Sequence, residues 1–315
     1  MAASLATFDA ILKNQYLGPI REQLNNDVVL LQQLDKDQES VVGKNFTIPV
    51  HYAGNNGLAA LGENGTLPTA GAQSYKETIV PMKYVYGRIQ ITGPSIRAAR
   101  SDSGAFVRAI DSETKGLTRD MKKWLNKMLW GDGTGSTGKE VMGLAGIVSA
   151  TSTLQGLAPA TYTWWKANIL GNGGTARAIT ENLLQTGMDT TEINSDGEVK
   201  LIMTTHGVSR AYQALLTATR QYVNTMDLKG GRKALSMNGK PLVVDKDAPT
   251  GKLFMLDTDA LKIYELSDFD WMDQDGAILS RVPNMDAYEA TLFRYFELGC
   301  SARNAQTLIE DLLES

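Results

Sequence analysis

Two reactive residue types are scarce in this chain of 315 residues, which has one cysteine and two histidines. The single cysteine, Cys300, excludes an internal disulfide and fits a reducing compartment. His51 and His206 together with one cysteine are too few for the common zinc sites. No stretch is apolar for long enough to span a membrane, and residues 1–26 carry Asp9 and lack the apolar core of a secretory signal. The sequence therefore predicts a soluble, cytosolic product.

An excess of one charge sign is also lacking. The formal net charge is -4, and 21% of the residues are charged while 43% are hydrophobic, which is ordinary globular composition. A protein whose function is to grip nucleic-acid phosphates tightly would carry an excess of basic residues. The length favours about two domains.

One glycine-rich stretch, GDGTGSTGKE at residues 131–140, comes close to a phosphate-binding loop. Gly133, Gly138 and Lys139 have the required spacing, but Glu140 stands where a serine or threonine would ligate magnesium. A phosphate loop also follows a strand and begins a helix, whereas this stretch follows a helical pattern. It predicts a helix stop and a loose turn, and no cofactor is expected.

An acidic stretch, DFDWMDQDG at residues 268–276, partly matches a calcium-binding loop. Aligning Asp273 and Gly276 to that pattern places Trp271 and Val282 at the first and last ligand positions, where neither can bind a metal. The stretch predicts a solvated acidic loop. Since no Gly-x-Ser-x-Gly elbow is present either, no catalytic residue stands out and the sequence does not indicate an enzyme.

The N-terminal region, residues 1–43, has the features of an arm. Apolar residues three to four apart predict an amphipathic helix within residues 5–31, broken in two at Gly18-Pro19. The region is one-sided and too short for a core of its own, so we expect it to bury little within its own chain.

A long loop between two strand-like segments follows. One strand begins near Lys44, and the other alternates over residues 75–92, with Val85 on one side and Tyr84 and Tyr86 on the other. Residues 51–74 between them are rich in glycine, asparagine and alanine and show no strong periodicity. Loops of this length are usually functional or mobile, so the segment predicts a projecting arm that needs a neighbour.

Residues 104–130 predict one long helix of about 40 Å, ended by Gly131. Its expected apolar positions are Phe106, Val107, Ile110, Leu117, Met121, Trp124, Leu125, Met128 and Leu129. The polar face of its second half carries four cations, Arg119, Lys122, Lys123 and Lys127. Two interpretations stay open: compensation of the helix dipole, or a face turned towards a polyanion.

The C-terminal half predicts a compact α+β arrangement. A buried-type strand at 199–205 precedes a helix, and a basic, glycine-rich loop at 228–240 follows. Short strands and finally one long aromatic strand complete the chain.

In this order, the segments resemble the major capsid proteins of tailed bacteriophages, which have the Hong Kong ninety-seven shell fold. The resemblance covers essentially the whole chain. It is carried by the glycine-rich loop between two strands, the long helix ending in LWGDGTG before GLAGIV, and the stretches MNGKPLVVDKDAPTGKLFMLDTDALKIYE and YEATLFRYFELGCSARNAQTLIEDL.

The resemblance implies an α+β shell fold in four parts. These are an N-terminal arm (1–43), an extended loop with flanking strands (44–92), a peripheral domain with a long spine helix (93–180 and 281–315), and an axial domain (181–280).

The function that the resemblance implies is that of a structural subunit of an icosahedral phage head. The subunits would assemble in the host cytoplasm into hexamers and pentamers that enclose the double-stranded DNA genome in the virion. Family members that carry their own scaffold begin with an extra domain, so the resemblance implies a separate scaffolding protein, or none. Portal and head-decoration proteins are further candidate partners. Packaged DNA would be contacted weakly and non-specifically. The alternatives are an encapsulin-type nanocompartment shell protein and, more distantly, a P-loop nucleotide-binding enzyme.

Two groups of residues are candidate subunit contacts. In the extended loop they are Asn55, Asn56, Glu63 and Asn64, and around the basic loop they are Asp227, Lys229, Arg232 and Lys233. In a shell, the basic loop would lie where five or six axial domains meet, so its cations would repel unless a neighbour's acids interleave with them. Asp227 is a candidate for that pairing; the other interpretation is a solvated loop.

Overall fold

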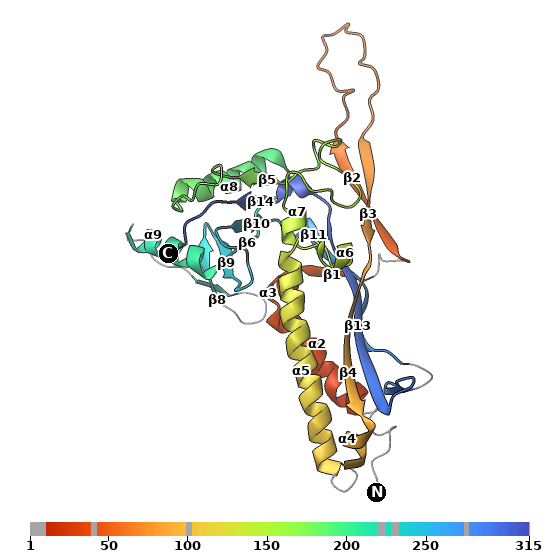
Figure 1. Cartoon of the computed structure of the whole chain (residues 1–315). Coiled ribbons are helices and arrows are strands. Elements are labelled where there is room, and N and C mark those ends of the chain that lie inside the picture. The colour runs from red at the N-terminus through yellow and green to blue at the C-terminus, as the bar shows by residue number, and fades with distance from the viewer. Residues whose placement is uncertain are drawn as a thin grey trace.

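The computed structural model describes residues 11–38, 43–98, 103–218, 225–227, 233–273 and 277–314. Within these ranges the strands form a five-stranded sheet, a seven-stranded sheet and a two-stranded ribbon that projects from the body (Figure 1). One long helix runs beside the five-stranded sheet (Figure 1). The predicted α+β class is confirmed. No helix in the described part of the chain is both long and apolar enough to cross a membrane.

The N-terminal segment, which we define as residues 11–37, packs on its own chain. It consists of a π-helical turn η1 (Leu12–Tyr16), α2 (Leu17–Asp27), α3 (Val29–Gln33) and β1 (Asp35–Asp37). Leu12, Leu24 and Leu30 are fully buried, and α2 contacts both the long helix and strand β11 (Leu261–Trp271). The expectation that this region buries little within its own chain is therefore wrong for the described part, because its apolar stripe is covered by the same subunit.

The predicted break at Gly18-Pro19 is also wrong. Pro19 lies in the first turn of α2, directly after the wider η1 turn, which accommodates the missing backbone donor. The helix ends instead at Val28, whose backbone is extended with ψ of 101°.

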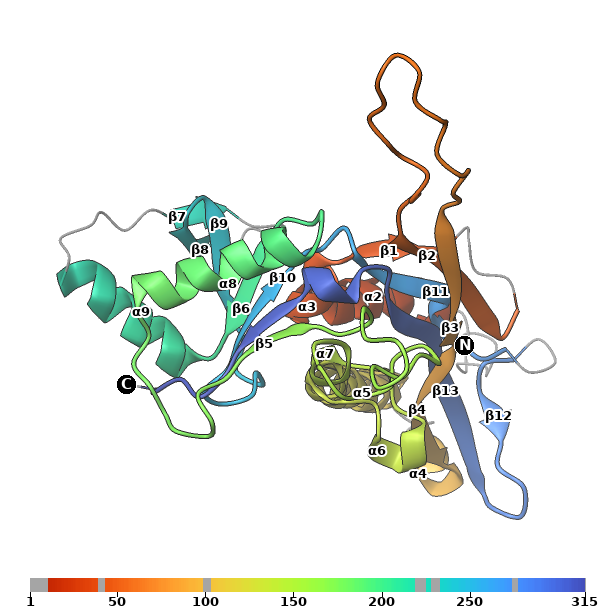
Figure 2. The same ribbon diagram turned by 90° about the horizontal axis from the view of Figure 1, so that it is seen from above.

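The ribbon consists of β2 (Asn45–Ala53) and β3 (Ser74–Pro81), which pair antiparallel from Asn45↔Pro81 to His51↔Tyr75. The residues between them, 54–73, form the extended loop, which stands away from the rest of the chain in both views (Figures 1 and 2). The prediction of a projecting loop is confirmed.

The five-stranded sheet is organised around β13 (Ala287–Cys300), the predicted long aromatic strand. It pairs with β4 (Lys83–Thr92), β11 and the short β12 (Ser280–Arg281), and β1 joins the free edge of β11. Alternation along β4 follows the sequence pattern, since Val85 is buried while Tyr84 and Tyr86 are 45% and 48% exposed. One face of β4 therefore serves the core and the other faces solvent.

The long helix α5 (Ser103–Trp130) lies along β4, beyond the short α4 (Gly93–Ala98), and Gly131 follows its last residue. Leu125, Met128 and Leu129 on its apolar stripe are buried, as predicted. Gly87 of β4 allows the close approach, because a side chain there would meet Met121 Sδ at 2.5 Å.

Trp124 does not belong to the buried stripe of α5, although the sequence pattern placed it there. Its side chain is 40% exposed, at the edge of the apolar stripe. The backbone of Phe106 and Val107 lies in α5, but their side chains fall outside the described part.

The seven-stranded sheet lies to the other side of α5 (Figure 1). Its order is β5 (Asn168–Leu170), β14 (Thr307–Ile309), β10 (Leu253–Leu256), β6 (Leu201–Thr204), β9 (Lys240–Val244), β8 (Lys233–Met237) and β7 (Thr225–Asp227). Two helices, α8 (Glu181–Asn194) and α9 (His206–Ala218), share a hydrophobic cluster with this sheet through Ile202 and Met255. From the other face, Phe254 meets Trp130 of α5 with ring centroids 5.3 Å apart.

Sheet membership does not follow the expected boundary at residue 280. Strand β11 lies within 181–280 but pairs with β13 in the five-stranded sheet, while β14 lies within 281–315 and pairs with β10 in the seven-stranded sheet. The chain thus passes between the two sheets several times.

The acidic stretch at 268–276 is not simply a solvated loop, because its first four residues belong to β11. Phe269 is fully buried and Asp268 takes part in an ion-pair cluster. Residues 274–276 lie outside the described residues.

Candidate assembly surfaces

The residues that could carry chemistry do not converge in the described part of the chain, where no group of three or more His, Cys, Asp or Glu side chains could hold a metal. Burial raises the pKa of the Cys300 thiol to about 12, so this thiol is protonated at neutral pH. The glycine-rich stretch follows α5 and leads through α6 (Gly135–Gly138) to α7 (Leu144–Ile147), so the predicted helix-before-loop order is confirmed. Glu140 accepts a hydrogen bond from Ser136 Oγ at 3.2 Å and belongs to this turn.

The extended loop exposes large apolar side chains. Leu58 is 83% exposed, Leu61 46% and Leu67 82%. Its two arms meet at a narrow neck, where a side chain on Gly57 would come within 2.5 Å of Gly71 N. Three exposed leucines on a segment that forms no core are the feature expected of a surface that another chain covers.

The loop residues nominated from the sequence divide between the neck and the far end. Asn55 Oδ1 accepts a hydrogen bond from Gly57 N at 2.7 Å, which shapes the neck, and Asn56 lies beside it. Glu63 and Asn64 form an exposed turn closed by Gly65 N and Gly62 O at 3.0 Å. All four side chains are exposed.

The residues nominated around the basic loop are described only in part. Lys229 and Arg232 lie outside the described residues, and only the backbone of Asp227 and Lys233 is described. These two residues pair directly across the β7–β8 hairpin. The two paired residues therefore flank residues 228–232, which lie outside the described part of the chain.

An aromatic loop, residues 154–165, packs against the ribbon. Tyr52 stacks on Trp164 with ring centroids 4.9 Å apart, and Ile79 N donates to Gln155 O at 3.1 Å. Thr78 Oγ1 also donates to Ile48 O across the ribbon. These contacts fix the direction of the ribbon, and none of them involves the extended loop.

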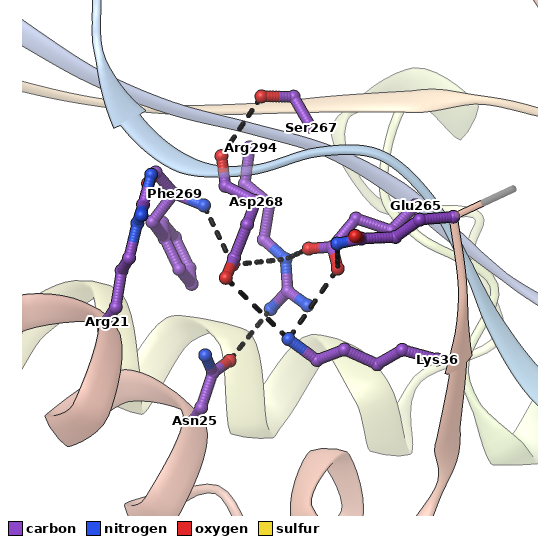
Figure 3. Close-up of polar contacts among 9 residues, drawn as sticks. Arg21, Asn25, Lys36, Glu265, Ser267, Asp268, Phe269 and Arg294 are labelled. Carbon is purple, nitrogen blue, oxygen red and sulfur yellow. Dashed lines mark hydrogen bonds and ion pairs between the residues drawn. The ribbon is translucent and has the colours of Figure 1, made fainter.

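A buried ion-pair cluster ties the N-terminal segment to the five-stranded sheet (Figure 3). Arg294 Nε of β13 lies 2.6 Å from Glu265 Oε1 of β11, and both side chains are fully buried. Lys36 of β1 approaches Glu265 at 3.6 Å and Asp268 at 3.8 Å. Asn25 of α2 accepts from Arg294 Nη1 at 3.5 Å. Two cations thus meet two carboxylates, which lets the charges be buried.

Aromatic rings complete this cluster. The Arg294 guanidinium lies 4.4 Å from the ring centroid of Phe296 and 4.9 Å from that of Phe269, in cation–π geometry. Arg21 of α2 donates to Phe269 O at 2.6 Å. The cluster was not predicted from the sequence, where its signal was a single arginine within the aromatic strand pattern TLFRYFELGC.

A second buried carboxyl, Glu297, lines a cavity of about 400 Å³ beneath the ribbon. Its Oε1 accepts from Met142 N at 2.7 Å and from Leu298 N at 2.9 Å. Burial raises the pKa of Glu297 to about 8, although these hydrogen bonds act in the opposite direction. Glu297 thereby joins β13 to the segment that directly follows the glycine-rich stretch.

The family model of the SU10 major capsid protein matches residues 85–277, which is more than half of the chain. The chain belongs to this family of major capsid proteins. It is a structural subunit of a phage capsid, and the resemblance noted from the sequence is confirmed.

Solved structures share the fold at low sequence identity. The capsid asymmetric unit of cyanophage A-1(L) matches with a TM-score of 0.70 and 17% identity, covering 89% of this chain and 90% of that chain. The capsid of a native GTA particle matches with a TM-score of 0.61 and 12% identity over 91% of both chains.

The holo-SrpI encapsulin complex from Synechococcus elongatus PCC 7942 matches with a TM-score of 0.58 and 13% identity, over 90% of this chain and 86% of that chain. No curated protein matches the chain. The encapsulin and the phage capsids share the fold, and the family model favours the capsid function.

Proposed function

We propose that copies of this subunit form hexamers and pentamers that close into an icosahedral head around double-stranded DNA, assembled in the host cytoplasm. The observation that carries the proposal is the extended loop, which exposes Leu58, Leu61 and Leu67 and stands away from the body of the subunit. A neighbouring subunit that covers these leucines removes apolar area from water, at roughly 25 cal/mol per Å². Repeated around a ring, this contact joins each copy to the next.

Asn55, Asn56, Glu63 and Asn64 are the polar contacts that we propose around those leucines. Their side chains are exposed at the neck and at the far turn, so they can hydrogen-bond to a neighbour once the apolar residues are covered.

The basic hairpin is the second proposed contact. We assign the seven-stranded sheet to the axial position, so that the β7–β8 hairpins of five or six copies face one another. Lys229, Arg232 and Lys233 would then need acids from the neighbouring copy, and Asp227 is the proposed partner. Reversing Arg232 and Lys233 to glutamate should impair capsomer formation, less so at high salt, without changing helix content. Normal assembly of that variant at low salt would leave the hairpin as a solvated turn.

Electron microscopy of the purified full chain tests the proposal directly. We expect closed shells from the wild type and none from a variant in which residues 57–71 are deleted, while both have the same circular dichroism. Shells that form without these residues would contradict the role of the extended loop. Particles that hold a protein cargo in place of DNA would favour the encapsulin alternative.

A separate scaffolding protein, a portal and head-decoration proteins are further partners that we propose, on the basis of the family. Co-expression with the neighbouring genes of the same phage, followed by microscopy, would test whether closed shells require a scaffold.

The subunit acts by assembly rather than by chemistry in this proposal, and it neither binds nor hydrolyses ATP. Support comes from Glu140, which is hydrogen-bonded within its own turn at the magnesium position. Lys139→Ala should leave assembly unchanged; saturable ATP binding that this variant loses would contradict the proposal.

A further inference from the structure

The exposed side of α5 carries a row of cations over its second half. Arg119, Lys123 and Lys127 are all exposed and follow one another at intervals of four residues. Four residues advance a helix by about 6 Å and leave side chains on nearly the same side, so the three charges form one line. We call Arg119, Lys123, Trp124 and Lys127 the basic stripe.

The helix dipole explains only the end of the basic stripe. A cation is stabilised by the dipole within the last turn, which includes Lys127. Lys123 lies two turns from the end and Arg119 three turns. Like charges four residues apart repel by about 0.2–0.5 kcal/mol per pair, so the row weakens the helix on its own.

The described residues do not neutralise the stripe. Lys123 and Lys127 have no ion-pair or hydrogen-bond partner among them. Arg119 reaches only its neighbour Asp120, at 3.4 Å, where both side chains are more than two-thirds exposed. Exposed pairs of this kind contribute little. The three cations of the stripe thus have only this one exposed acid beside them among the described residues, in a chain whose net charge is -4.

Trp124 adds a partly exposed aromatic ring beside the row, about one turn before Lys127. It is 40% exposed, whereas Trp130, Trp165 and Trp271 are at most 4% exposed. Its indole ring carries one hydrogen-bond donor, the N–H group, and no acceptor. A line of cations with an aromatic ring beside its last member is a surface suited to an extended polyanion.

We propose that the basic stripe is the surface on which this subunit contacts packaged double-stranded DNA, and hence that α5 faces the interior of the shell. The inference rests on the proposed function and deepens it. A duplex presents one negative charge per about 1.7 Å of its axis, so it supplies several phosphates along the row whatever its sequence. Three cations per subunit give weak, non-specific and salt-dependent contact. Weak contact is required because the genome must be able to leave the shell.

The opposite surface provides the contrast. The outer face of β4 and β13 presents Tyr84, Tyr86 and Tyr295, whose rings pack on one another. There Arg88 is paired with Glu289. Since the five-stranded sheet lies between the two surfaces, the stripe and the tyrosines cannot both face the DNA (Figure 1).

Fluorescence anisotropy of a labelled duplex of arbitrary sequence tests the inference on the unassembled full chain. Lys123→Glu/Lys127→Glu should weaken binding by about tenfold or more at low salt and reduce the slope of log affinity against log salt by about 2. The matched control is Lys76→Glu/Lys166→Glu, which changes the net charge equally at exposed positions outside α5 and should bind like the wild type. DNA should also change the fluorescence of the wild type and not that of Trp124→Phe.

Three results would overturn the inference: unchanged binding by the stripe variant, equal weakening in the control, or binding of polyglutamate in preference to the duplex, which would point to an acidic protein partner. If the reversal variant does not fold, Lys123→Gln/Lys127→Gln serves in its place and should reduce the salt slope by the same amount. Shell formation is scored separately by microscopy. If the stripe variant forms shells and binds DNA like the wild type, only the inference about the stripe is refuted. If the wild type forms no shells, either alone or co-expressed with the neighbouring genes, the proposed function is refuted.

Discussion

The N-terminal segment and the extended loop were both expected to bury little within their own chain, and they have opposite places in the structure. Each carries leucines on a stretch that cannot form a core alone. Leu12, Leu24 and Leu30 of the N-terminal segment are fully buried against the same subunit, whereas Leu58 and Leu67 of the loop are more than 80% exposed. The difference lies in polar anchoring, since Lys36 and Asn25 connect the segment to the buried Arg294–Glu265 pair (Figure 3).

This difference separates what stabilises the subunit from what joins subunits. Substitutions at the anchored segment and its sheet should lower the stability of the isolated subunit. Substitutions in the loop should leave that stability unchanged and act on assembly.

The largest effect is expected from Arg294→Met. The substitution leaves Glu265 as a buried charge without its main partner, so it should destabilise the subunit by about 3–5 kcal/mol in chemical unfolding. The double variant Arg294→Met/Glu265→Gln removes both charges and should recover part of that loss. A single variant within 1 kcal/mol of the wild type, by the same measurement, would show that the cluster does not anchor the segment.

The next largest loss of stability is expected from truncating a core side chain of α5. Leu125→Ala in α5 removes a fully buried side chain and should cost about 2–5 kcal/mol. Lys123→Ala, two residues away on the exposed side, should stay within about 0.5 kcal/mol. Equal destabilisation by both would refute the assignment of the two faces of α5.

The buried carboxyl of Glu297 should make the stability of the subunit depend on pH, an effect of intermediate size. Its pKa is raised from 4.5 to about 8 in the folded subunit, so the protonated form is favoured by folding. The associated stability is present below about pH 4.5 and is lost as the pH rises through about 8. Glu297→Gln keeps the acceptor for Met142 N and should flatten the fall in unfolding midpoint between pH 5 and pH 9. An identical fall in both proteins would assign the pH dependence to other groups.

The smallest effect on the subunit is expected from Leu58→Ser. Leu58 is 83% exposed and touches no core, so the free energy of unfolding should change by less than about 0.5 kcal/mol. The yield of closed shells should nevertheless fall, because the covered leucine surface becomes polar. A Leu58→Ser variant that loses stability but assembles normally would contradict the role of the extended loop in joining subunits.

Local patterns in the sequence predicted the elements well, and pairing between distant elements less well. Alternation along β4 and the apolar stripe of α5 are local, and both are confirmed at Val85, Leu125 and Met128. Trp124 was misplaced because a stripe of helical spacing does not show how far the covering layer extends.

The buried ion pair could not be predicted from spacing, since Glu265 and Arg294 meet only through the register of β11 on β13. The same holds for the N-terminal segment, whose apolar side could have been covered by its own chain or by a neighbour. The extended loop was predictable because its glycine-rich composition leaves it no core to join.

Hydrogen exchange of the unassembled subunit and of the closed shell, resolved along the chain, tests the central comparison most directly. Amides of residues 54–73 should exchange rapidly in the subunit and become protected in the shell. Amides of residues 17–33 should be protected in both states. Strong and equal protection of residues 54–73 before and after assembly would contradict the claim that a neighbouring subunit completes the extended loop.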